Sequence, residues 1–422
     1  MPRYDAVVVG AGPGGAATAT SLARGGARVL LCDRSSFPRD KTCGGGLTPR
    51  GVGAIERLGV PLAADEALRV DGIEMVGRDG SLKVGFPETA RWPSHGLVGR
   101  RSVVDGKIFE AAVASGVDVR TGVRVIGPLF EDGVCRGVRV RNNGSVEDVE
   151  AAWSVAADGA TSVVARGAGL ADTVSSGRGF WYTALRAYFG PVDARDKMLE
   201  FYPLRTASGR WLPAYGWVFP LPDGGANVGV DIPHAPALGA CPSLHEAFDG
   251  FIERLRRERP GFAGAAMEAP PQGALLPEAM RGFRPGAPGL LCVGDAAGLI
   301  TPYSGEGIAY ALESAELAAD AMLGSSTPSE IVRRYQHALR RNYGFQFATA
   351  LRVMKAMRIG PLAGAAAALG FGSPRLLRAA VRVMAYLIED EPTTSTASRL
   401  YRTVERAVSS PAPSLRRGGM RD

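Results

Sequence analysis

Three glycines near the N-terminus, Gly10, Gly12 and Gly15, have the G-x-G-x-x-G spacing of a loop that binds the pyrophosphate of a dinucleotide. In such a loop the first glycine permits a tight turn, the second lets the backbone approach the pyrophosphate, and the third lets a helix pack closely on a strand. The positive end of the helix that follows stabilises the phosphate charge. We therefore expect the cofactor contacts to include Gly10, Gly12, Pro13, Gly14 and Gly15.

The segments around this loop have the patterns of a β-strand, a helix and a second strand. The Val-rich run Tyr4–Val9 predicts a buried parallel strand, and Ala16–Arg24 predicts a helix. A second strand is predicted over Arg28–Cys32, directly before Asp33. An acid at this distance from the glycine loop accepts from the ribose hydroxyls, so Asp33 and its neighbour Arg34 are predicted cofactor contacts.

Two later segments each combine an apolar strand with an acid–glycine turn. One covers residues 154–166, and the other covers residues 291–298 and continues into a predicted helix over Ile308–Leu323. An aspartate in the second turn can accept from a ribityl hydroxyl, and the N–H groups that open the helix can stabilise negative charge on a reduced isoalloxazine. With Arg101, which precedes another predicted helix, the expected contacts are Asp158, Gly159, Gly294, Asp295, Ala296, Gly305, Gly307 and Ile308.

Taken in this order, the three segments resemble the glutathione-reductase-type flavoproteins of the aromatic-hydroxylase branch. The resemblance implies one FAD, bound by all three segments in a Rossmann-type domain. A second G-x-G-x-x-G flanked by a strand and a helix does not occur downstream, so no separate NAD(P)H domain is expected. We expect the electrons to come from transiently bound NAD(P)H or from a reduced electron-carrier protein, such as a separate reductase.

Two further motifs favour one branch of these flavoproteins. The stretch 37–50 contains Cys43-Gly44-Gly45-Gly46, and three glycines let a backbone lie flat against a planar ring. The segment 215–220, Tyr-Gly-Trp-Val-Phe-Pro, begins a predicted hairpin with aromatic residues at alternate positions. Alternate residues of a strand share one face, so these side chains suit the wall of an apolar site.

Both motifs look like those of the geranylgeranyl reductase family, which carries a P-x-x-K-x-C-G-G loop near the flavin and a Y-x-W-x-F-P segment at the lipid site. The resemblance implies reduction of C=C bonds in a geranylgeranyl or polyprenyl-quinone lipid such as a menaquinone. It places Cys43, Gly44 and Gly45 near the flavin and Tyr215, Trp217, Phe219 and Pro220 at the substrate. The halogenase motif W-x-W-x-I-P is absent, but a flavin-dependent monooxygenase of an aromatic or polyketide metabolite stays open as the alternative.

Reduction of an isolated prenyl double bond needs a proton as well as hydride from the reduced flavin N5, because such a bond is not electrophilic. The site must therefore hold a proton donor and otherwise exclude water. The candidate catalytic residues are Cys43, Tyr215 and Glu306. Cys43 can equally shape the site, and Glu306 can instead be a favourable acid in the first turn of a helix.

The composition of the 422 residues predicts a two-part protein with sizeable cores, since 46% are hydrophobic. The five cysteines lack CxxC spacing, so neither a disulfide framework nor a metal site is expected. We expect an α/β fold with a Rossmann-type FAD-binding domain, an antiparallel β-sheet substrate domain and C-terminal helices. The FAD-binding domain is predicted from 1–75, 95–170 and 280–330, the substrate domain from 76–94 and 171–279, and a helical cap from 331–422.

Positive charge is concentrated at the C-terminus. The net charge is +7, and residues 331–422 carry 16 basic and 5 acidic residues. Arg375, Arg378 and Arg382 have the spacing of one helix face, which predicts either a solvated basic face or a peripheral contact with an anionic membrane. Nucleic acid is not expected as a partner. Because the uncharged stretch 360–373 is shorter than a membrane span of about 20 residues, we expect a cytoplasmic protein, peripheral at the inner membrane surface.

Overall fold

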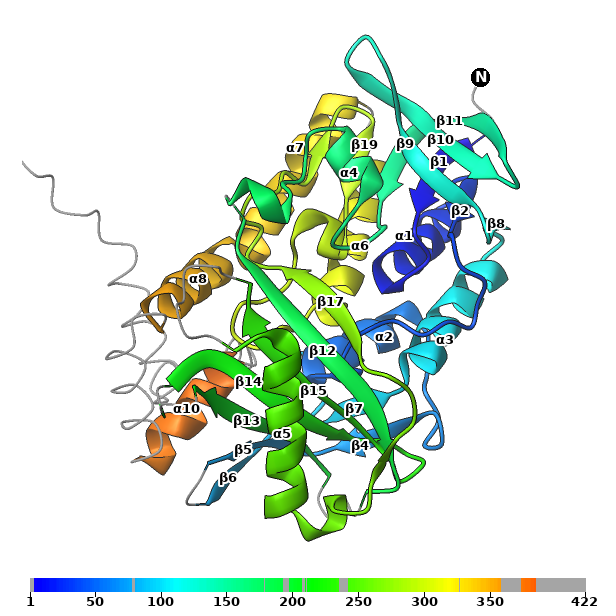
Figure 1. The fold of residues 1–422 in the computed structure, drawn as a ribbon. Coiled ribbons are helices and arrows are strands. Elements are labelled where there is room, and N and C mark those ends of the chain that lie inside the picture. The colour runs from blue at the N-terminus through cyan, green and yellow to red at the C-terminus, as the bar shows by residue number, and fades with distance from the viewer. Residues whose placement is uncertain are drawn as a thin grey trace, which may run out of the picture.

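The computed structural model describes residues 4–77, 80–177, 179–192, 197–206, 209, 211–234, 242–325, 327–357 and 373–384. One half is built around a mostly parallel sheet flanked by helices, and the other around a large sheet of mainly antiparallel strands (Figure 1). Each half has its own cluster of buried apolar side chains. The chain passes between the halves several times, so the residues of each half come from separate parts of the sequence.

The first sheet has the strand order β18-β19-β11-β1-β2-β8, and β10 and β9 extend it beside β11. Its strands are β1 (Tyr4–Val9), β2 (Val29–Cys32), β8 (Asp118–Arg120), β9 (Arg124–Glu131), β10 (Val134–Asn142), β11 (Ser145–Ala156), β18 (Gly286–Ala287) and β19 (Leu290–Cys292). The parallel strands β2, β1, β11 and β19 all end at the same edge, where their last residues adjoin one another. The three cofactor segments predicted from sequence follow these strand ends.

Helices cover this sheet and position its loops. They are α1 (Pro13–Arg24), α2 (Pro49–Leu58), α3 (Arg101–Ala114), α4 (Val163–Gly167) and α6 (Ile308–Leu323). Helix α1 begins three residues earlier than its sequence pattern predicts, because Pro13 occupies the first turn, where its missing N–H leaves no hydrogen bond unmade. Helix α1 packs against both α3 and α6. The glycine loop is thereby held between the strand ends and two helices.

The second sheet has the order β16-β12-β15-β14-β13-β5-β6, with β17 beside β12. Its strands are β5 (Gly72–Val76), β6 (Ser81–Gly85), β12 (Trp181–Gly190), β13 (Met198–Arg205), β14 (Trp211–Pro220), β15 (Ala226–Pro233), β16 (Ala266–Met267) and β17 (Gln272–Pro277). Helix α5 (Leu244–Glu258) packs against β12 and β15. It starts at a capping box, in which Ser243 and Glu246 each bind the other's backbone N–H.

Two features of this sheet differ from the sequence expectation. Strand β5 pairs in parallel with β13, while the other pairings of the sheet are antiparallel. In addition, β5 begins at Gly72, so residues 72–75 lie in this sheet although the sequence pattern assigned them to the first half. Strand pairing across more than 100 residues leaves no local signal in the sequence, so sequence patterns do not reveal that these residues join the second sheet.

A third, small sheet consists of β3 (Gly46–Leu47), β7 (Gly96–Gly99) and β4 (Ala67–Val70). Short single-turn helices occur at η1 (Val174–Ser176), η2 (Pro260–Phe262) and η3 (Gly294–Ala297). Strand β3 continues directly from the Cys43–Gly45 segment, so pairing with β7 anchors that loop at its C-terminal end.

The described C-terminal elements are α7 (Pro328–Leu339), the π-helical turn η4 (Arg340–Gly344), α8 (Phe345–Met357) and α10 (Pro374–Met384). Tyr335 on α7 donates a 2.8 Å hydrogen bond to the carbonyl of Cys292, which ties this helix to the first sheet. Much of the predicted cap, including the uncharged stretch to residue 372 and the chain beyond 384, lies outside the described residues. Within the described part of the chain, no helix is both long and apolar enough to cross a membrane.

Candidate active site

The glycine loop fits a bound pyrophosphate at one position and is closely packed at two others. A Cβ atom at Gly10, where φ is +97°, would lie 2.4 Å from the carbonyl oxygen of Ala157, and one at Gly15 would lie 1.8 Å from the carbonyl oxygen of Gly10. A Cβ at Gly12 would meet a single atom within 4 Å among the described residues, Nη2 of Arg39 at 3.4 Å. Gly10 and Gly15 are therefore required by packing, while Gly12 faces a space that a pyrophosphate can fill.

Asp33 lies at the end of β2, beside the glycine loop. Its Oδ2 accepts a 2.7 Å hydrogen bond from the amide of Ala11, and its Oδ1 accepts one of 2.8 Å from the amide of Ser35. These bonds orient the carboxylate, and each oxygen retains a lone pair for a ribose hydroxyl. Arg34, the next residue, is exposed.

The carboxylate of Asp158, which was predicted to contact the cofactor, is hydrogen-bonded to residues at the start of α4. Its carboxylate accepts from the Ser162 hydroxyl and, at 2.7 Å, from the amide of Val163, so it caps α4. Burial raises the pKa of Asp158, and the hydrogen bond from Ser162 opposes this shift. Gly159 has φ +83°, with nothing within 4 Å of a Cβ placed there among the described residues. The backbone at Ala157 and Asp158, not the carboxylate, packs against the glycine loop at Gly10.

The segment that follows β19 brings a second acid to the same edge. The amide of Gly294 donates a 3.0 Å hydrogen bond to Oγ of Ser314 on α6, which fixes the turn. Asp295 accepts a 3.1 Å hydrogen bond from the ammonium group of Lys41. A Cβ at Gly307 would lie 3.3 Å from Asp295 Oδ1, so the carboxylate lies over the start of α6. Ala296 and Ile308 are buried beside it.

The Cys43–Gly46 loop lies against aromatic side chains of the second half. A Cβ at Gly44 would lie 2.8 Å from Cε2 of Phe219, and one at Gly45, where φ is +72°, would lie 2.4 Å from the carbonyl oxygen of Gly99. The glycines therefore allow the backbone to approach both Phe219 and β7 closely. The predicted contact of this loop with a flavin ring stays a prediction.

Charged side chains hold this loop from both sides. On the side of the second sheet, the Arg186 guanidinium donates a 2.5 Å hydrogen bond to Asp40. On the side of α3, Arg101 is buried, binds Asp105 through two nitrogens at 2.7 and 2.8 Å, and is also hydrogen-bonded to the thiol of Cys43. Burial alone would lower the pKa of the Arg101 guanidinium, but Asp105 and then Cys43 raise it above its ordinary value.

Arg39, rather than the buried Arg101, lies over the glycine loop. Its Nη1 donates a 2.9 Å hydrogen bond to Asp105, and its Nη2 lies next to Gly12. Its guanidinium also lies 4.8 Å from the centre of the Phe37 ring, which stacks on Phe109 of α3. Arg39 was not predicted from the sequence, because the sequence around a loop arginine does not show which segment the side chain will contact.

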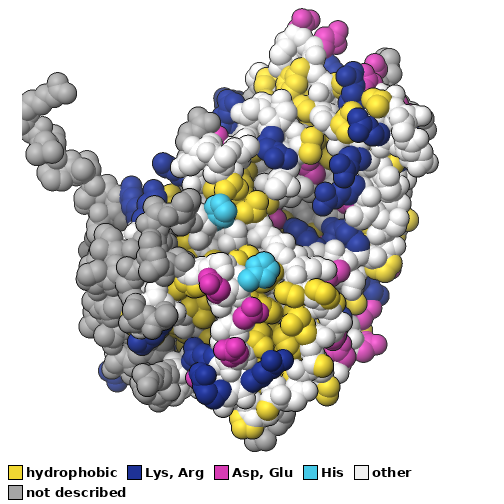
Figure 2. All heavy atoms as spheres, viewed as in Figure 1, with side chains coloured by type: hydrophobic (Ala, Val, Ile, Leu, Met, Phe, Trp, Pro, Cys, Tyr) yellow, Lys and Arg dark blue, Asp and Glu magenta, His cyan; other side chains and the backbone are white. Residues whose placement is uncertain are grey.

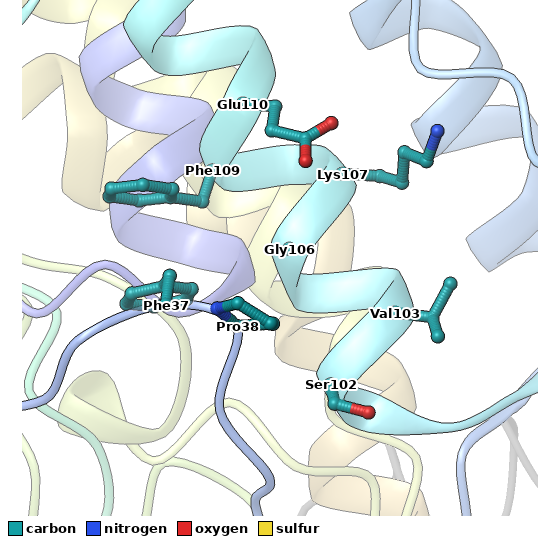
Figure 3. A pocket seen from close by; sticks show the side chains of 8 residues that line it. All are labelled: Phe37, Pro38, Ser102, Val103, Gly106, Lys107, Phe109 and Glu110. Atoms are coloured by element: carbon teal, nitrogen blue, oxygen red, sulfur yellow. The ribbon is translucent and has the colours of Figure 1, made fainter.

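A cavity of about 340 Å³ lies beside this region, between the Phe37–Pro38 segment and α3 (Figure 3). The rings of Phe37 and Phe109 lie face to face on one side of it, and the side chains of Lys107 and Glu110 also line it. None of the predicted catalytic or substrate residues lines it. The cavity is therefore separate from the region where Cys43 and Tyr215 lie.

The aromatic residues of β14 share one face, as their alternation predicts. The ring centres of Tyr215 and Trp217 are 6.2 Å apart, as are those of Trp217 and Phe219. Trp217 and Phe219 are buried in a cluster with Phe201 and residues of β5, and Pro220 is buried at the strand end. The indole N–H of Trp217 donates a 3.0 Å hydrogen bond to the side chain of Asn227.

The loop before α6 joins the two halves of the site. The Tyr215 hydroxyl donates a 2.7 Å hydrogen bond to the carbonyl of Ser304, and a Cβ at Gly305 would lie 2.8 Å from that hydroxyl. Glu306 accepts a 2.5 Å hydrogen bond from the hydroxyl of Thr48 at the start of α2. Burial raises the pKa of Glu306 to about 7, against the hydrogen bond from Thr48, which lowers it. Glu306 therefore faces α2, while Tyr215 faces the opposite side of the loop.

Two buried polar residues of β15, Asn227 and Asp231, were missed by sequence reasoning. Asn227 donates a 2.8 Å hydrogen bond from Nδ2 to the carbonyl of Cys43. Asp231 pairs across the sheet with Tyr215 and is hydrogen-bonded to its side chain. The signal available was the presence of Asn and Asp in an otherwise apolar strand, because buried polar side chains need specific partners.

The structure thus brings four segments together at one edge of the first sheet: Gly10–Gly15, Asp33, Gly294–Ala296 and the Gly305 loop. The Cys43–Gly46 loop lies between this edge and the Tyr215–Phe219 face of the second sheet. Figure 2 shows a hollow across the middle of one face, between the two halves, with Lys and Arg side chains around it. Among the residues that the structure describes, no group of three His, Cys, Asp or Glu side chains could hold a metal ion.

A protein family and several known proteins of similar length match this chain. Residues 3–205 match the family described as FAD binding domain. The menaquinone reductase of Mycolicibacterium smegmatis is 32% identical over 405 residues, which cover 95% of this chain and 96% of that protein. The digeranylgeranylglycerophospholipid reductase of Thermoplasma acidophilum is 28% identical over 355 residues, covering 81% and 85% of the two chains.

A solved structure from Thermoplasma acidophilum, described as geranylgeranyl bacteriochlorophyll reductase-like, has the same fold. Its TM-score is 0.72 at 23% sequence identity, and the match covers 97% of each chain. The predicted α/β fold with an FAD-binding half is therefore confirmed.

Proposed function

We propose that this chain, which belongs to the geranylgeranyl reductase family of FAD-dependent oxidoreductases, reduces a carbon–carbon double bond in a prenyl chain. The strongest support is that two loops of the proposed flavin site both pack against the aromatic face of β14. The Cys43–Gly46 loop packs on Phe219, and the Ser304–Gly305 loop packs on Tyr215 of the same strand. A flavin held by these loops would face an apolar wall, which suits an apolar substrate.

The residues present fit FAD. Gly12 leaves space for a pyrophosphate, Arg39 and the start of α1 offer it positive charge, and Asp33 is oriented for a ribose. We propose that Asp295 binds the ribityl chain, with Lys41 holding its carboxylate in place. When bound and reduced, the flavin supplies an electron pair together with one hydrogen.

Among prenyl lipids, we propose a menaquinone as the substrate to test first. The menaquinone reductase of Mycolicibacterium smegmatis matches this chain over a larger share of both proteins than the digeranylgeranylglycerophospholipid reductase does. The electrons would come from NAD(P)H or from a reduced electron-carrier protein, since the sequence contains one dinucleotide loop and that loop lies at the proposed FAD site.

We also propose that α10 contacts an anionic membrane surface, where prenyl lipids reside. Arg375 and Arg378 are exposed on this helix, and so is Leu376 between them, with 40% of its surface accessible. Basic residues near an anionic surface each contribute about 1 kcal/mol of attraction. Flotation with phosphatidylglycerol vesicles tests this, because Arg375→Glu/Arg378→Glu should abolish co-flotation if the helix is the contact.

The reaction itself is tested without oxygen. The purified protein is loaded with FAD, reduced with dithionite and mixed with a menaquinone, and flavin absorbance and product mass are followed together. Reoxidation with the gain of two hydrogens in the prenyl chain is the expected result. Failure with every prenyl lipid, combined with oxygen insertion into an aromatic metabolite in air, would replace the reductase by the monooxygenase alternative.

A further inference from the structure

We propose that Asp231 is the acid that supplies the proton for this reduction, and that Tyr215 passes the proton from Asp231 toward the substrate. The inference rests on the proposed function, because it names the source of the second hydrogen of the same reaction. An isolated alkene accepts an electron pair only when one of its carbons gains a proton, so the site needs a donor screened from bulk water.

The position of Asp231 at the junction of the two halves is the first support. Asp231 on β15 lies directly opposite Tyr215 on β14 in the strand ladder. Its side chain is 2% exposed, and its Oδ1 has no hydrogen-bond partner among the described residues. Its Oδ2 lies 3.3 Å from the position of a Cβ at Gly305, and the Tyr215 hydroxyl lies 2.8 Å from the same point. Both groups therefore meet at the loop that we assign to the flavin.

A count of hydrogens gives the second support. The Tyr215 hydroxyl carries one hydrogen, which it donates to the carbonyl of Ser304 at 2.7 Å. Its hydrogen bond with Asp231 must then take its hydrogen from Asp231, because a phenol oxygen can accept while it donates. This arrangement requires a neutral, protonated Asp231. Among the residues that the structure describes, no cation acts on Asp231, and a buried carboxyl in such surroundings favours the protonated state.

The electrostatics of the pair agree with this count. Burial raises the pKa of Asp231 and so favours its protonated form. A hydrogen bond donated by Tyr215 would lower that pKa, but the single hydroxyl hydrogen of Tyr215 is donated to Ser304. Burial also raises the pKa of the Tyr215 phenol, followed by the effects of Asp231, Glu278 and Cys43. These are the titratable groups that act on Tyr215 from β15, from the end of β17 and from the glycine-rich loop. Both groups are therefore neutral before the reaction, which is the state a proton donor needs.

The proposed step is balanced. One alkene carbon gains a hydrogen with the electron pair from the reduced cofactor. The other gains a proton from the Tyr215 hydroxyl, which turns from the carbonyl of Ser304 toward the substrate. As the O–H bond of Tyr215 breaks, its oxygen takes the proton of Asp231, so that the charge left behind is an Asp231 carboxylate. Water returns a proton to Asp231 before the next turnover.

The two other candidate acids are bound elsewhere. The Cys43 sulfur accepts a 3.4 Å hydrogen bond from the amide of Gly45 and is hydrogen-bonded to Arg101, on the side of α3. Glu306 is bound to Thr48, on the side of α2. Of these three acids, Asp231 alone is hydrogen-bonded to Tyr215, which lies on the aromatic face of β14.

The test compares Asp231→Asn and Tyr215→Phe with Asp249→Asn, which changes an exposed acid on α5 of the same half. Each variant is loaded with FAD, reduced with one equivalent of dithionite and mixed anaerobically with a menaquinol, whose reduced ring cannot accept the electrons. We expect FAD binding and chemical reduction to be unchanged in all three. Reoxidation by the lipid should fall at least about 100-fold in Asp231→Asn, and by at least about tenfold in Tyr215→Phe, since general-acid catalysis contributes about 10²–10⁴.

An infrared measurement gives a readout independent of turnover. Because Glu306 also holds a proton in part at neutral pH, the readout is a difference spectrum. Wild type minus Asp231→Asn should contain the C=O stretch of a protonated carboxyl, and wild type minus Asp249→Asn should not. A band insensitive to Asp231→Asn, or an Asp231→Asn protein that reoxidises at the wild-type rate, would overturn the inference. A failure of the proposed function looks different: the wild type and Asp249→Asn would then also fail to reoxidise with any prenyl lipid, and the inference would fall with it.

Discussion

The side-chain amide of Asn227 donates a 2.8 Å hydrogen bond to the backbone carbonyl of Cys43, which lies 184 residues earlier in the chain. Asn227 is fully buried, and its Oδ1 accepts from the indole of Trp217. One amide thus joins the glycine-rich loop of the first half to the aromatic face of the second. Trp217 is buried and Cys43 is half-buried, so losing this amide would leave an indole N–H and a carbonyl without these hydrogen bonds.

Replacement of Asn227 by alanine should therefore destabilise the protein by on the order of 3 kcal/mol, since each buried orphan group costs about 1–3 kcal/mol. The measurement is urea-induced unfolding followed by tryptophan fluorescence and circular dichroism. The control is Asn142→Ala, at an exposed position of β10, which should change stability by less than about 0.5 kcal/mol. Equal stability of the two variants would show that the Asn227 bridge contributes nothing.

Gly12 and Gly15, in the loop that follows β1, should differ in effect: one substitution should change FAD affinity and the other protein stability. Gly15→Ala should lower the melting temperature of the FAD-free protein, because the new Cβ would overlap the carbonyl oxygen of Gly10 at 1.8 Å. Gly12→Ala should leave that temperature unchanged, since its Cβ meets one flexible guanidinium, but should weaken FAD binding at least about tenfold, or about 1.4 kcal/mol.

Gly127→Ala provides the control for both glycine variants, because no described atom lies within 4 Å of a Cβ there. Melting curves of the FAD-free proteins and FAD titration by fluorescence measure the two effects separately. Normal FAD affinity in Gly12→Ala would exclude a close approach of the pyrophosphate to this residue.

Glu306 should make the protein less stable as the pH rises. Its pKa is about 7 in the folded protein against an ordinary value of 4.5, because of burial. Between these values the folded protein retains a proton that the unfolded chain has lost. The free energy of unfolding therefore falls as pH rises from about 4.5 to 7, and the loss is complete above pH 7.

Glu306→Gln should remove this dependence, which we expect to be on the order of 1–3 kcal/mol. The difference between the melting temperatures at pH 5 and pH 8 should be smaller in this variant than in the wild type. Glu253→Gln, at an exposed position of α5, should keep the wild-type difference. An unchanged difference in Glu306→Gln would mean that Glu306 is ionised throughout this range.

Two arginines of α2 form ion pairs with α6 that should contribute very differently. Arg50 is buried and binds Glu313 through two nitrogens, at 2.9 and 2.6 Å, while Arg57 binds Glu316 at 3.2 Å in a pair that is largely exposed. Arg50→Met should destabilise the protein by about 3–5 kcal/mol, because Glu313 would be left as a buried charge bound to Tyr343 alone among its present side-chain partners.

Arg57→Met should change stability by no more than about 1 kcal/mol, as is usual for exposed pairs. Urea unfolding of both variants measures the contrast. Adding Glu313→Gln to Arg50→Met should restore part of the loss, because it removes the uncompensated charge. If the double variant is less stable than Arg50→Met, buried charge is not the cause of the destabilisation.

Much of the fold and the family was predictable from the sequence because the relevant signals are local. The strand Tyr4–Val9 and the helix Ile308–Leu323 were predicted with the bounds that the structure shows, since apolar runs and helical composition act over neighbouring residues. The loop around Cys43 and the segment from Tyr215 indicated the geranylgeranyl reductase family, which the whole-chain relatives confirm.

The tertiary structure alone decided which side chains meet. Arg39, rather than Arg101, lies over Gly12, and Asp158 caps a helix, because these positions depend on how α3 and α4 pack against the first sheet. The pairing of Asp231 with Tyr215 follows from the register of two antiparallel strands, and the bond from Asn227 to Cys43 follows from the docking of two sheets. The sequence by itself determined the elements and the cofactor class, through periodicity and glycine spacing. Contacts between residues far apart in the chain depend on packing, which no local pattern specifies.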